Sequence, residues 1–129
     1  MKMKSRMIAG IGVDIVDVER MKTAIEAWEE TFLKKMFTES EIAYCSSKKS
    51  PHIHYAARFA AKEAVAKAMH TGWSGTFRWR DVEVVNQPSG EPRVVLHGKV
   101  ASALAGSLVH LSLSHTETTV VAFAVIEKM

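Results

Sequence analysis

The sequence predicts one α+β domain with a mostly antiparallel sheet, and three observations favour this fold class. Residues 8–16 alternate between large aliphatic and small or acidic side chains, as in a strand. Residues 18–69 instead repeat their apolar side chains at helical spacing, and residues 77–127 return largely to alternation. With 129 residues, 47% of them hydrophobic and 24% charged, the chain resembles an ordinary globular domain. We expect that domain to span residues 1–129.

The first predicted strand, residues 8–16, has two unlike faces. One face carries Ile11, Val13 and Ile15, and the other carries Gly10, Gly12, Asp14 and Val16. A charge in an apolar strand costs several kcal/mol if it is buried without a partner. Asp14 therefore either lies at the rim of the sheet, where it can cap a loop, or binds a cation. The two glycines would let a ligand or another backbone approach closely.

Three predicted helices follow this strand. Asp17 can cap a helix over residues 18–36, in which apolar residues recur at helical spacing. The sequence Thr38–Glu41 is a capping box that opens a second, short helix. Ser50 is expected to cap the third helix, with Pro51 in its first turn.

The third helix sorts its side chains onto two sides. One side consists almost entirely of small residues, namely Ala57, Ala60, Ala61, Ala64, Val65 and Ala68, so it can pack closely against a neighbour. The other side carries Arg58, Lys62, Glu63 and Lys67. A solvated Glu63–Lys67 pair would contribute only about 0.2–0.5 kcal/mol. Three cations and one carboxylate would also suit a ligand that is phosphorylated and bound to a metal.

The remainder of the chain predicts two hairpins separated by a short helix, after a break at Gly72–Gly75. In order, the predicted elements are a strand over 77–84 with a bulge near Asp81, the turn 87–92, a strand over 94–96, a helix over 99–108, and strands over 109–114 and 119–127.

The net charge, the cysteine count and the lengths of the apolar runs limit the cellular locations and the kinds of binding partner that we expect. The formal charge of +3 and the isoelectric point of about 9.1 favour an acidic partner or a phosphorylated ligand, and fall short of a nucleic-acid-binding pattern. The single cysteine, Cys45, excludes an internal disulfide and fits a reducing cytosol. The early apolar run is broken by Asp14 and Asp17, and the longest one, residues 120–126, is too short to span a membrane. We expect a cytoplasmic protein that binds neither membranes nor nucleic acid.

Two acids stand out as candidate metal ligands. Magnesium commonly takes one or two carboxylates together with substrate phosphates and waters. Asp14 and Glu63 could supply the carboxylates, with Arg58, Lys62 and Lys67 around the phosphates. Only the fold could bring these residues together, so residue type and spacing leave the site as a hypothesis.

Three blocks in the same order resemble the 4'-phosphopantetheinyl transferases, most closely the short holo-acyl-carrier-protein synthases. The blocks are residues 10–16, 58–68 and 111–116, and residues 37–41 and 90–98 are also similar. The resemblance extends from about residue 8 to residue 127. One departure is His70, where relatives often have glycine after the helix.

The resemblance implies that the chain transfers the phosphopantetheine arm of coenzyme A to a serine of an apo-acyl carrier protein, in fatty acid biosynthesis. The second product would be 3',5'-ADP. Asp14 and Glu63 would be ligands of magnesium, or of manganese, and would act in catalysis with Lys67. The base that takes the serine proton stays open between Glu63, a magnesium-bound water and His115.

The resemblance also implies how coenzyme A and the carrier are held. Lys62 and Lys67 would hold phosphate oxygens, Arg58 would lie at the adenosine 3'-phosphate, and His115 would also contact the coenzyme. Arg20 would dock the acidic carrier protein. The short synthases are homotrimers with active sites between subunits, so the same assembly is expected here.

Two alternatives remain from the residues alone. A small basic module that binds RNA or an acidic protein would place aromatic residues among cations, as in Trp73, Phe77 and Trp79 beside Arg78 and Arg80. Core packing of a hairpin with polar alternation explains that stretch better, and such a module leaves Asp14 and Glu63 without a role. A degenerate transferase that only binds the carrier is disfavoured by the intact acids and lysines.

Overall fold

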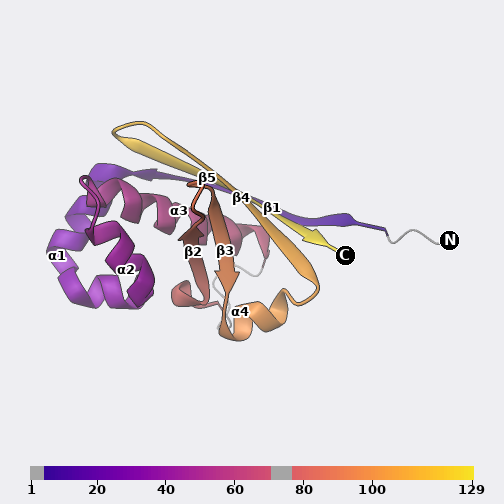
Figure 1. Ribbon diagram of the computed structural model, residues 1–129. Helices are drawn as coiled ribbons and strands as arrows, with labels where there is room; N and C mark the ends of the chain where they lie inside the picture. The colour runs from indigo at the N-terminus through magenta and orange to yellow at the C-terminus, as the bar shows by residue number, and fades with distance from the viewer. Residues whose placement is uncertain (1–4, 71–76) are drawn as a thin grey trace.

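The computed structural model describes residues 5–70 and 77–129 and confirms the α+β class. Its elements are β1 (Met7–Asp17), α1 (Val18–Met36), α2 (Glu39–Ser46), α3 (Pro51–Ala68), the 3-10 turn η1 (Trp79–Asp81), β2 (Val82–Asn86), β3 (Pro92–Leu96), α4 (Gly98–Ala103), β4 (Ser107–His115) and β5 (Thr119–Lys128). The predicted break at Gly72–Gly75 and Trp73 lie outside the described residues. The helices and the β2–β3 hairpin lie on one side of the long sheet (Figure 1).

The long sheet is antiparallel, with strand order β1-β5-β4. Asp14 on β1 pairs with Ala122 on the central strand, which pairs in turn with Leu113 on β4. The predicted alternation of β1 is confirmed, because Gly10, Gly12, Asp14 and Val16 are buried or half-buried while Ile11, Val13 and Ile15 face outward. The outward face is strongly apolar and includes Ile11, Val13, Ile15, Leu108 and Phe123, each between 42% and 68% exposed.

The two glycines of β1 allow its backbone to touch the backbone of α3. A Cβ atom on Gly10 would lie 1.7 Å from the carbonyl oxygen of Ala68, and one on Gly12 would lie 1.9 Å from that of Ala64. Both distances are far inside van der Waals contact, so only glycine fits at either position. Of the two possibilities left open by the sequence, a backbone rather than a ligand makes the close approach.

The ends of the helices follow local rules with one exception. Asp17 Oδ1 accepts a hydrogen bond from Glu19 N at 2.9 Å, and the capping box of α2 is fully formed. Ser50 is the N-cap residue of α3, as predicted, but its side chain makes no capping hydrogen bond in the described chain. At the other end of α3, His70 adopts a φ of 58°, the left-handed conformation that favours glycine.

Two further predictions are corrected in the second half of the chain. The strand expected over residues 77–84 begins only at Val82, because Asp81 N bonds to Arg78 O at 3.1 Å and closes a 3-10 turn. The helix expected over residues 99–108 ends at Ala103, since Gly106 at a φ of 79° turns the chain into β4. The described helices include none with the length and apolar character needed to cross a bilayer.

Candidate active site

Asp14 and Glu63 come from different elements and line one hollow of about 330 Å³. Asp14 is on the inner face of β1 and Glu63 is on α3, and the backbone contact between these elements holds them side by side. Arg20, in the first turns of α1, lines the same hollow. Three predicted site residues are therefore brought together.

The electrostatics of Glu63 show how close the two acids are. Burial raises the pKa of Glu63, the negative charge of Asp14 raises it further, and Lys67 lowers it. Lys67 Nζ lies 2.9 Å from Asp14 Oδ1 and 3.0 Å from the carbonyl oxygen of Val13. The lysine side chain is 52% exposed, so solvent reaches its contact with Asp14, a residue that lines the hollow.

The donor set fits a divalent cation that completes its coordination from a substrate. Asp14 and Glu63 repel one another, and a cation between them would remove that repulsion. Within residues 5–70 and 77–129, no cluster of three or more histidine, cysteine, aspartate or glutamate side chains could hold a metal alone. Two carboxylates with phosphate oxygens and waters are the arrangement typical of Mg²⁺ sites.

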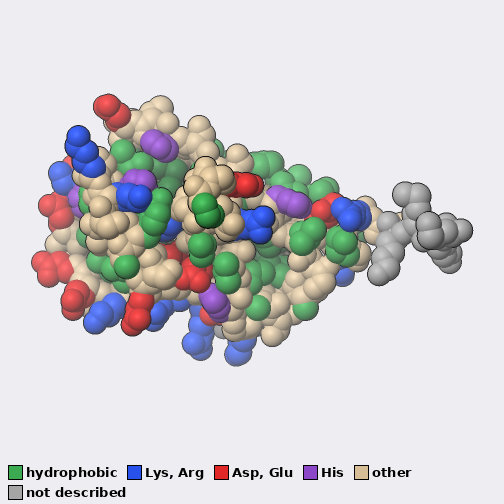
Figure 2. Space-filling view, in the orientation of Figure 1, with side chains coloured by type: hydrophobic (Ala, Val, Ile, Leu, Met, Phe, Trp, Pro, Cys, Tyr) green, Lys and Arg blue, Asp and Glu red, His purple; other side chains and the backbone are tan. Residues whose placement is uncertain are grey.

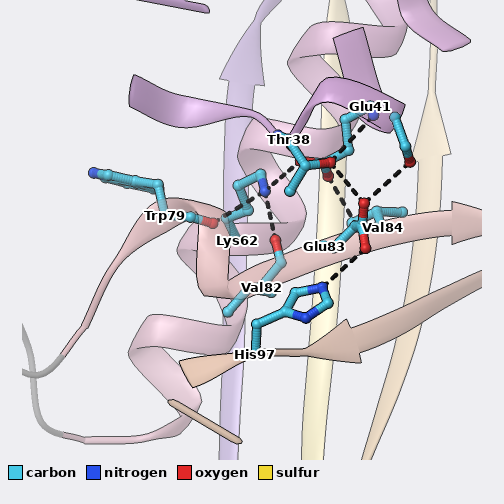
Figure 3. Close-up of polar contacts among 9 residues, drawn as sticks. Thr38, Glu41, Lys62, Trp79, Val82, Glu83, Val84 and His97 are labelled. Atoms are coloured by element: carbon cyan, nitrogen blue, oxygen red, sulfur yellow. Dashed lines mark hydrogen bonds and ion pairs between the residues drawn. The ribbon is translucent and has the colours of Figure 1, made fainter. Parts of the chain in front are cut away.

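Lys62 does not face this hollow, which corrects its predicted assignment to phosphate oxygens. Its side chain is fully buried, and its ammonium donates to Glu41 Oε1 at 2.8 Å, to Trp79 O at 3.0 Å and to Val82 O (Figure 3). Three donors thus meet three acceptors, as a charged lysine requires in the interior. Burial lowers the pKa of Lys62, and the Glu41 carboxylate opposes that change.

Glu41 completes this internal network. One carboxylate oxygen accepts from Thr38 N at 2.9 Å, and the other accepts from Val84 N at 2.9 Å (Figure 3). The sequence indicated Glu41 only as part of a capping box. No local signal marks its second role, because its partners are far away in the sequence. Together Glu41 and Lys62 connect α2, α3 and β2.

Arg58 lies in a separate group of basic residues. It is 3% exposed, its guanidinium carbon lies 4.2 Å from the centre of the Tyr44 ring, and its Nη2 donates to Asn86 Oδ1 at 2.8 Å. Its Nε atom is buried, with no hydrogen-bond partner among the described residues. Arg58 was expected on the charged side of this helix, and the packing of Tyr44 and Asn86 buries it there.

His115 belongs to the same group as Arg58. The pKa of His54 is lowered first by burial and then by the charges of Arg58, Lys48 and His115, so these basic groups lie near one another. His115 itself is exposed at the end of β4. Lys48 and His54 were not singled out from the sequence as ligands. The structure thus arranges the predicted residues as an acidic pair with Lys67 and Arg20, and a basic group around Arg58.

Known proteins share this sequence and fold over nearly their whole length. The sequence model of the 4'-phosphopantetheinyl transferase superfamily matches residues 10–124. A holo-[acyl-carrier-protein] synthase of Koribacter versatilis is 47% identical over 124 residues, covering 94% of this chain and 99% of that protein. The corresponding protein of Solibacter usitatus is 42% identical with the same coverage.

Solved structures agree with these relatives. The crystal structure of holo-[acyl-carrier-protein] synthase from Neisseria meningitidis superimposes with a TM-score of 0.87 at 35% identity, covering 95% of this chain and all of that one. A Bacillus anthracis synthase, solved in complex with CoA (3',5'-ADP), has a TM-score of 0.82 at 33% identity, with coverage of 95% and 99%. The chain therefore belongs to the 4'-phosphopantetheinyl transferase superfamily and, within it, to the holo-[acyl-carrier-protein] synthases.

Proposed function

We propose that this chain transfers 4'-phosphopantetheine from coenzyme A to a serine of an apo-acyl carrier protein and supplies carriers for fatty acid biosynthesis. The serine oxygen attacks the phosphorus that bears the pantetheine arm, and the bond to the adenosine-side phosphate breaks, releasing 3',5'-ADP. The observation that supports this function best is the pairing of Asp14 and Glu63, with Lys67 bonded to Asp14.

Asp14 and Glu63 would hold Mg²⁺, or Mn²⁺ in its place, and the bound ion would neutralise the diphosphate and stabilise charge on the leaving phosphate. Lys67 can turn from Asp14 toward a phosphate oxygen, because its side chain is half exposed and is bonded to a residue that lines the hollow. The serine proton would be taken up by Glu63, by a water held on the ion or by His115.

The basic group suits the other end of coenzyme A. Arg58 carries a buried donor with no described partner, and Lys48, His54 and His115 add positive or titratable groups near it. Such a group favours a dianion, so we assign it to the adenosine 3'-phosphate. Arg58 is pre-positioned by Tyr44 and Asn86, which lowers the entropy lost when a phosphate binds.

The carrier and the assembly complete the proposal. Acyl carrier proteins are acidic, and Arg20 and Lys22 are exposed cations on α1 near the hollow. The apolar outer face of the sheet, with Ile11, Val13 and Ile15 more than half exposed, favours a homotrimer in which this face is covered and the active sites lie between subunits. A cytoplasmic location agrees with the buried free thiol of Cys45.

Mass spectrometry of an apo-acyl carrier protein tests this function directly. Incubation with the chain, coenzyme A and magnesium should add about 340 Da, the mass of the phosphopantetheine arm, and EDTA should abolish the gain. A gain that persists in EDTA would contradict the metal requirement. No gain with any of several bacterial carriers would reject the transfer reaction.

A further inference from the structure

We propose that Asn86 is a positioning residue that holds the Arg58 guanidinium in place without neutralising its charge. Asn86 thereby makes the chain select a nucleotide that carries a 3'-phosphate over the same nucleotide with a free 3'-hydroxyl. Because Arg58 is assigned above to the adenosine 3'-phosphate of coenzyme A, this role of Asn86 rests on the proposed function.

Arg58 is a buried cation without an anionic partner in the described chain. It is 3% exposed, yet no carboxylate of residues 5–70 and 77–129 makes an ion pair with it. Lys62, the other buried cation of α3, instead lies 2.8 Å from a carboxylate oxygen of Glu41. An unpaired buried charge is costly, so a protein that keeps one leaves it available to an anion from outside the chain.

Asn86 bonds Arg58 with a neutral group where a carboxylate of the same shape would cancel the charge. Its Oδ1 accepts a hydrogen bond from Arg58 Nη2 at 2.8 Å, and its Nδ2 donates one to the carbonyl oxygen of Gly90 at 3.0 Å. An amide supplies both an acceptor and a donor, whereas an ionised aspartate supplies only acceptors. Aspartate at this position would therefore repel the Gly90 carbonyl and form an internal salt bridge with Arg58. The amide satisfies both neighbours and leaves the arginine with its full positive charge.

The turn that receives the second bond of Asn86 is itself closed by its own backbone. Gln87 N donates to Glu91 O at 2.8 Å, and Gly90 N donates to Gln87 O at 2.7 Å. Asn86 is the last residue of β2 and lies directly before this turn. Its side chain thus fixes an arginine of α3 to the end of the β2–β3 hairpin. A guanidinium held in this way loses little conformational entropy when a phosphate binds.

A second cation lies close to Arg58 through a shared aromatic ring. The guanidinium carbon of Arg58 lies 4.2 Å from the centre of the Tyr44 ring, and Lys48 Nζ lies 4.5 Å from the same centre. Lysine, arginine and histidine side chains also gather at the upper left of the molecule, near the tip of the β4–β5 hairpin (Figure 2). Two cations favour a phosphate dianion, and a hydroxyl in its place would leave both without a partner.

The test compares the binding of coenzyme A and 3'-dephospho-coenzyme A, which differ only in the 3'-phosphate, by titration calorimetry without a carrier. Asn86→Asp should weaken the binding of coenzyme A about tenfold or more and change the Kd of the dephospho form less than twofold. Asn86→Leu removes the acceptor but adds no charge, so it should weaken coenzyme A binding by a smaller factor. Gln87→Ala is the matched control, because the adjacent amide of Gln87 makes no side-chain hydrogen bond within the described residues. It should change neither Kd.

The ratio of the two Kd values is the deciding readout, because a merely structural role of Asn86 would weaken both ligands alike. A wild-type preference for coenzyme A that is unchanged in the Asn86 variants would overturn the positioning role and leave the proposed function standing. If Asn86→Asp does not fold, an unchanged ratio in Asn86→Leu overturns the role by itself. Equal binding of both ligands by wild type would overturn the 3'-phosphate assignment together with this role. A wild-type chain that binds neither ligand would overturn the proposed function as well.

Discussion

Two lysines on α3, little more than one turn apart, make nearly identical ion pairs in opposite surroundings. Lys62 Nζ lies 2.8 Å from Glu41 Oε1, and both side chains are 0% exposed. Lys67 Nζ lies 2.9 Å from Asp14 Oδ1, with 52% of the lysine and 14% of the aspartate exposed. The Lys62–Glu41 pair thus holds buried elements together, whereas the Lys67–Asp14 pair can separate in solvent.

The difference between these pairs teaches that a short lysine–carboxylate distance does not identify a functional group. Burying an ion pair costs desolvation free energy, which is offset only if every donor and acceptor of the pair finds a partner. The lysine of such a pair cannot leave its carboxylate without losing that compensation. An exposed pair is weak and solvent-screened, so its lysine can exchange one anion for another. Exposure, rather than distance, distinguishes the structural lysine from the candidate catalytic one.

The largest expected effect is that of Lys62→Met on stability. Removal of the ammonium leaves the Glu41 carboxylate buried without its cation, which should lower the free energy of unfolding by about 3–5 kcal/mol. Urea unfolding followed by circular dichroism measures this change. Adding Glu41→Gln to Lys62→Met should recover part of the loss, because the amide is neutral and still accepts hydrogen bonds. If the Lys62→Met chain were as stable as wild type, the buried Lys62–Glu41 pair would not be needed to hold the fold together.

Glu63→Gln should show the reverse pattern, with folding preserved and chemistry lost. The substitution keeps the shape of the side chain but removes one of two proposed metal ligands, so kcat/KM should fall about 100- to 1000-fold. Water proton relaxation with Mn²⁺ should show weaker metal binding in the same variant. Glu30→Gln, an exposed change on α1, serves as the control. Near-normal turnover in Glu63→Gln would remove Glu63 from the mechanism.

Lys67→Met is the direct counterpart of Lys62→Met. Because Lys67 is half exposed, the free energy of unfolding should change by less than about 1 kcal/mol. Loss of a cation beside the reacting phosphate should lower kcat/KM about 10- to 100-fold. Parallel unfolding and kinetic measurements on the two methionine variants test the comparison. Equal losses of stability in both would show that exposure does not separate them.

Glu83 is a partly buried carboxylate, intermediate between the two ion pairs, and its contribution to stability should depend on pH. Burial acts to raise its pKa, but hydrogen bonds from Thr38, His97 and Ser40 outweigh burial and bring the pKa below 4.5. A carboxyl with a lowered pKa stabilises the fold above its unfolded pKa and loses that contribution as the pH falls through the folded value. The stability advantage of wild type over Glu83→Gln should therefore shrink between about pH 5 and pH 3. A difference that is constant over this range would exclude Glu83 as a contributor.

The smallest effect is expected at the end of α3, where no ion pair is involved. His70→Gly removes the cost of a left-handed conformation and should raise the free energy of unfolding by up to about 1 kcal/mol. Ala27→Gly, which places glycine within helix α1, should lower it by a similar amount. Thermal unfolding of the three proteins measures both shifts. A destabilised His70→Gly chain would show that the imidazole makes a compensating contact.

Features with local causes could be predicted from the sequence. The caps at Asp17 and Thr38 need only residues within one helical turn, and the alternation of β1 is a property of the strand alone. Asp14 and Glu63 could be singled out because an acid is unexpected in each pattern. Their proximity could not be derived, since it depends on the glycine contact between β1 and α3.

The roles of Lys62 and Arg58 could not be read from a helical wheel. Such a projection separates apolar from charged sides, but which charged residues are covered depends on elements from elsewhere in the chain. The hairpin and η1 bring the carbonyls of Trp79 and Val82 over Lys62, and Asn86 reaches Arg58. The failed strand prediction belongs to the same stretch, where the carbonyl of Trp79 accepts bonds from Lys62 on α3 and from Val82 N within the 3-10 turn.

The backbone contact at Gly10 and Gly12 fixes the separation of β1 and α3 by the radii of main-chain atoms. Where side chains fill the space between two elements, larger and smaller residues can replace one another and the elements drift apart or together over evolutionary time. No such adjustment is open here. Asp14 follows Gly12 by two residues and Glu63 directly precedes Ala64. The spacing of the two carboxylates is therefore insulated from sequence divergence in the rest of the core.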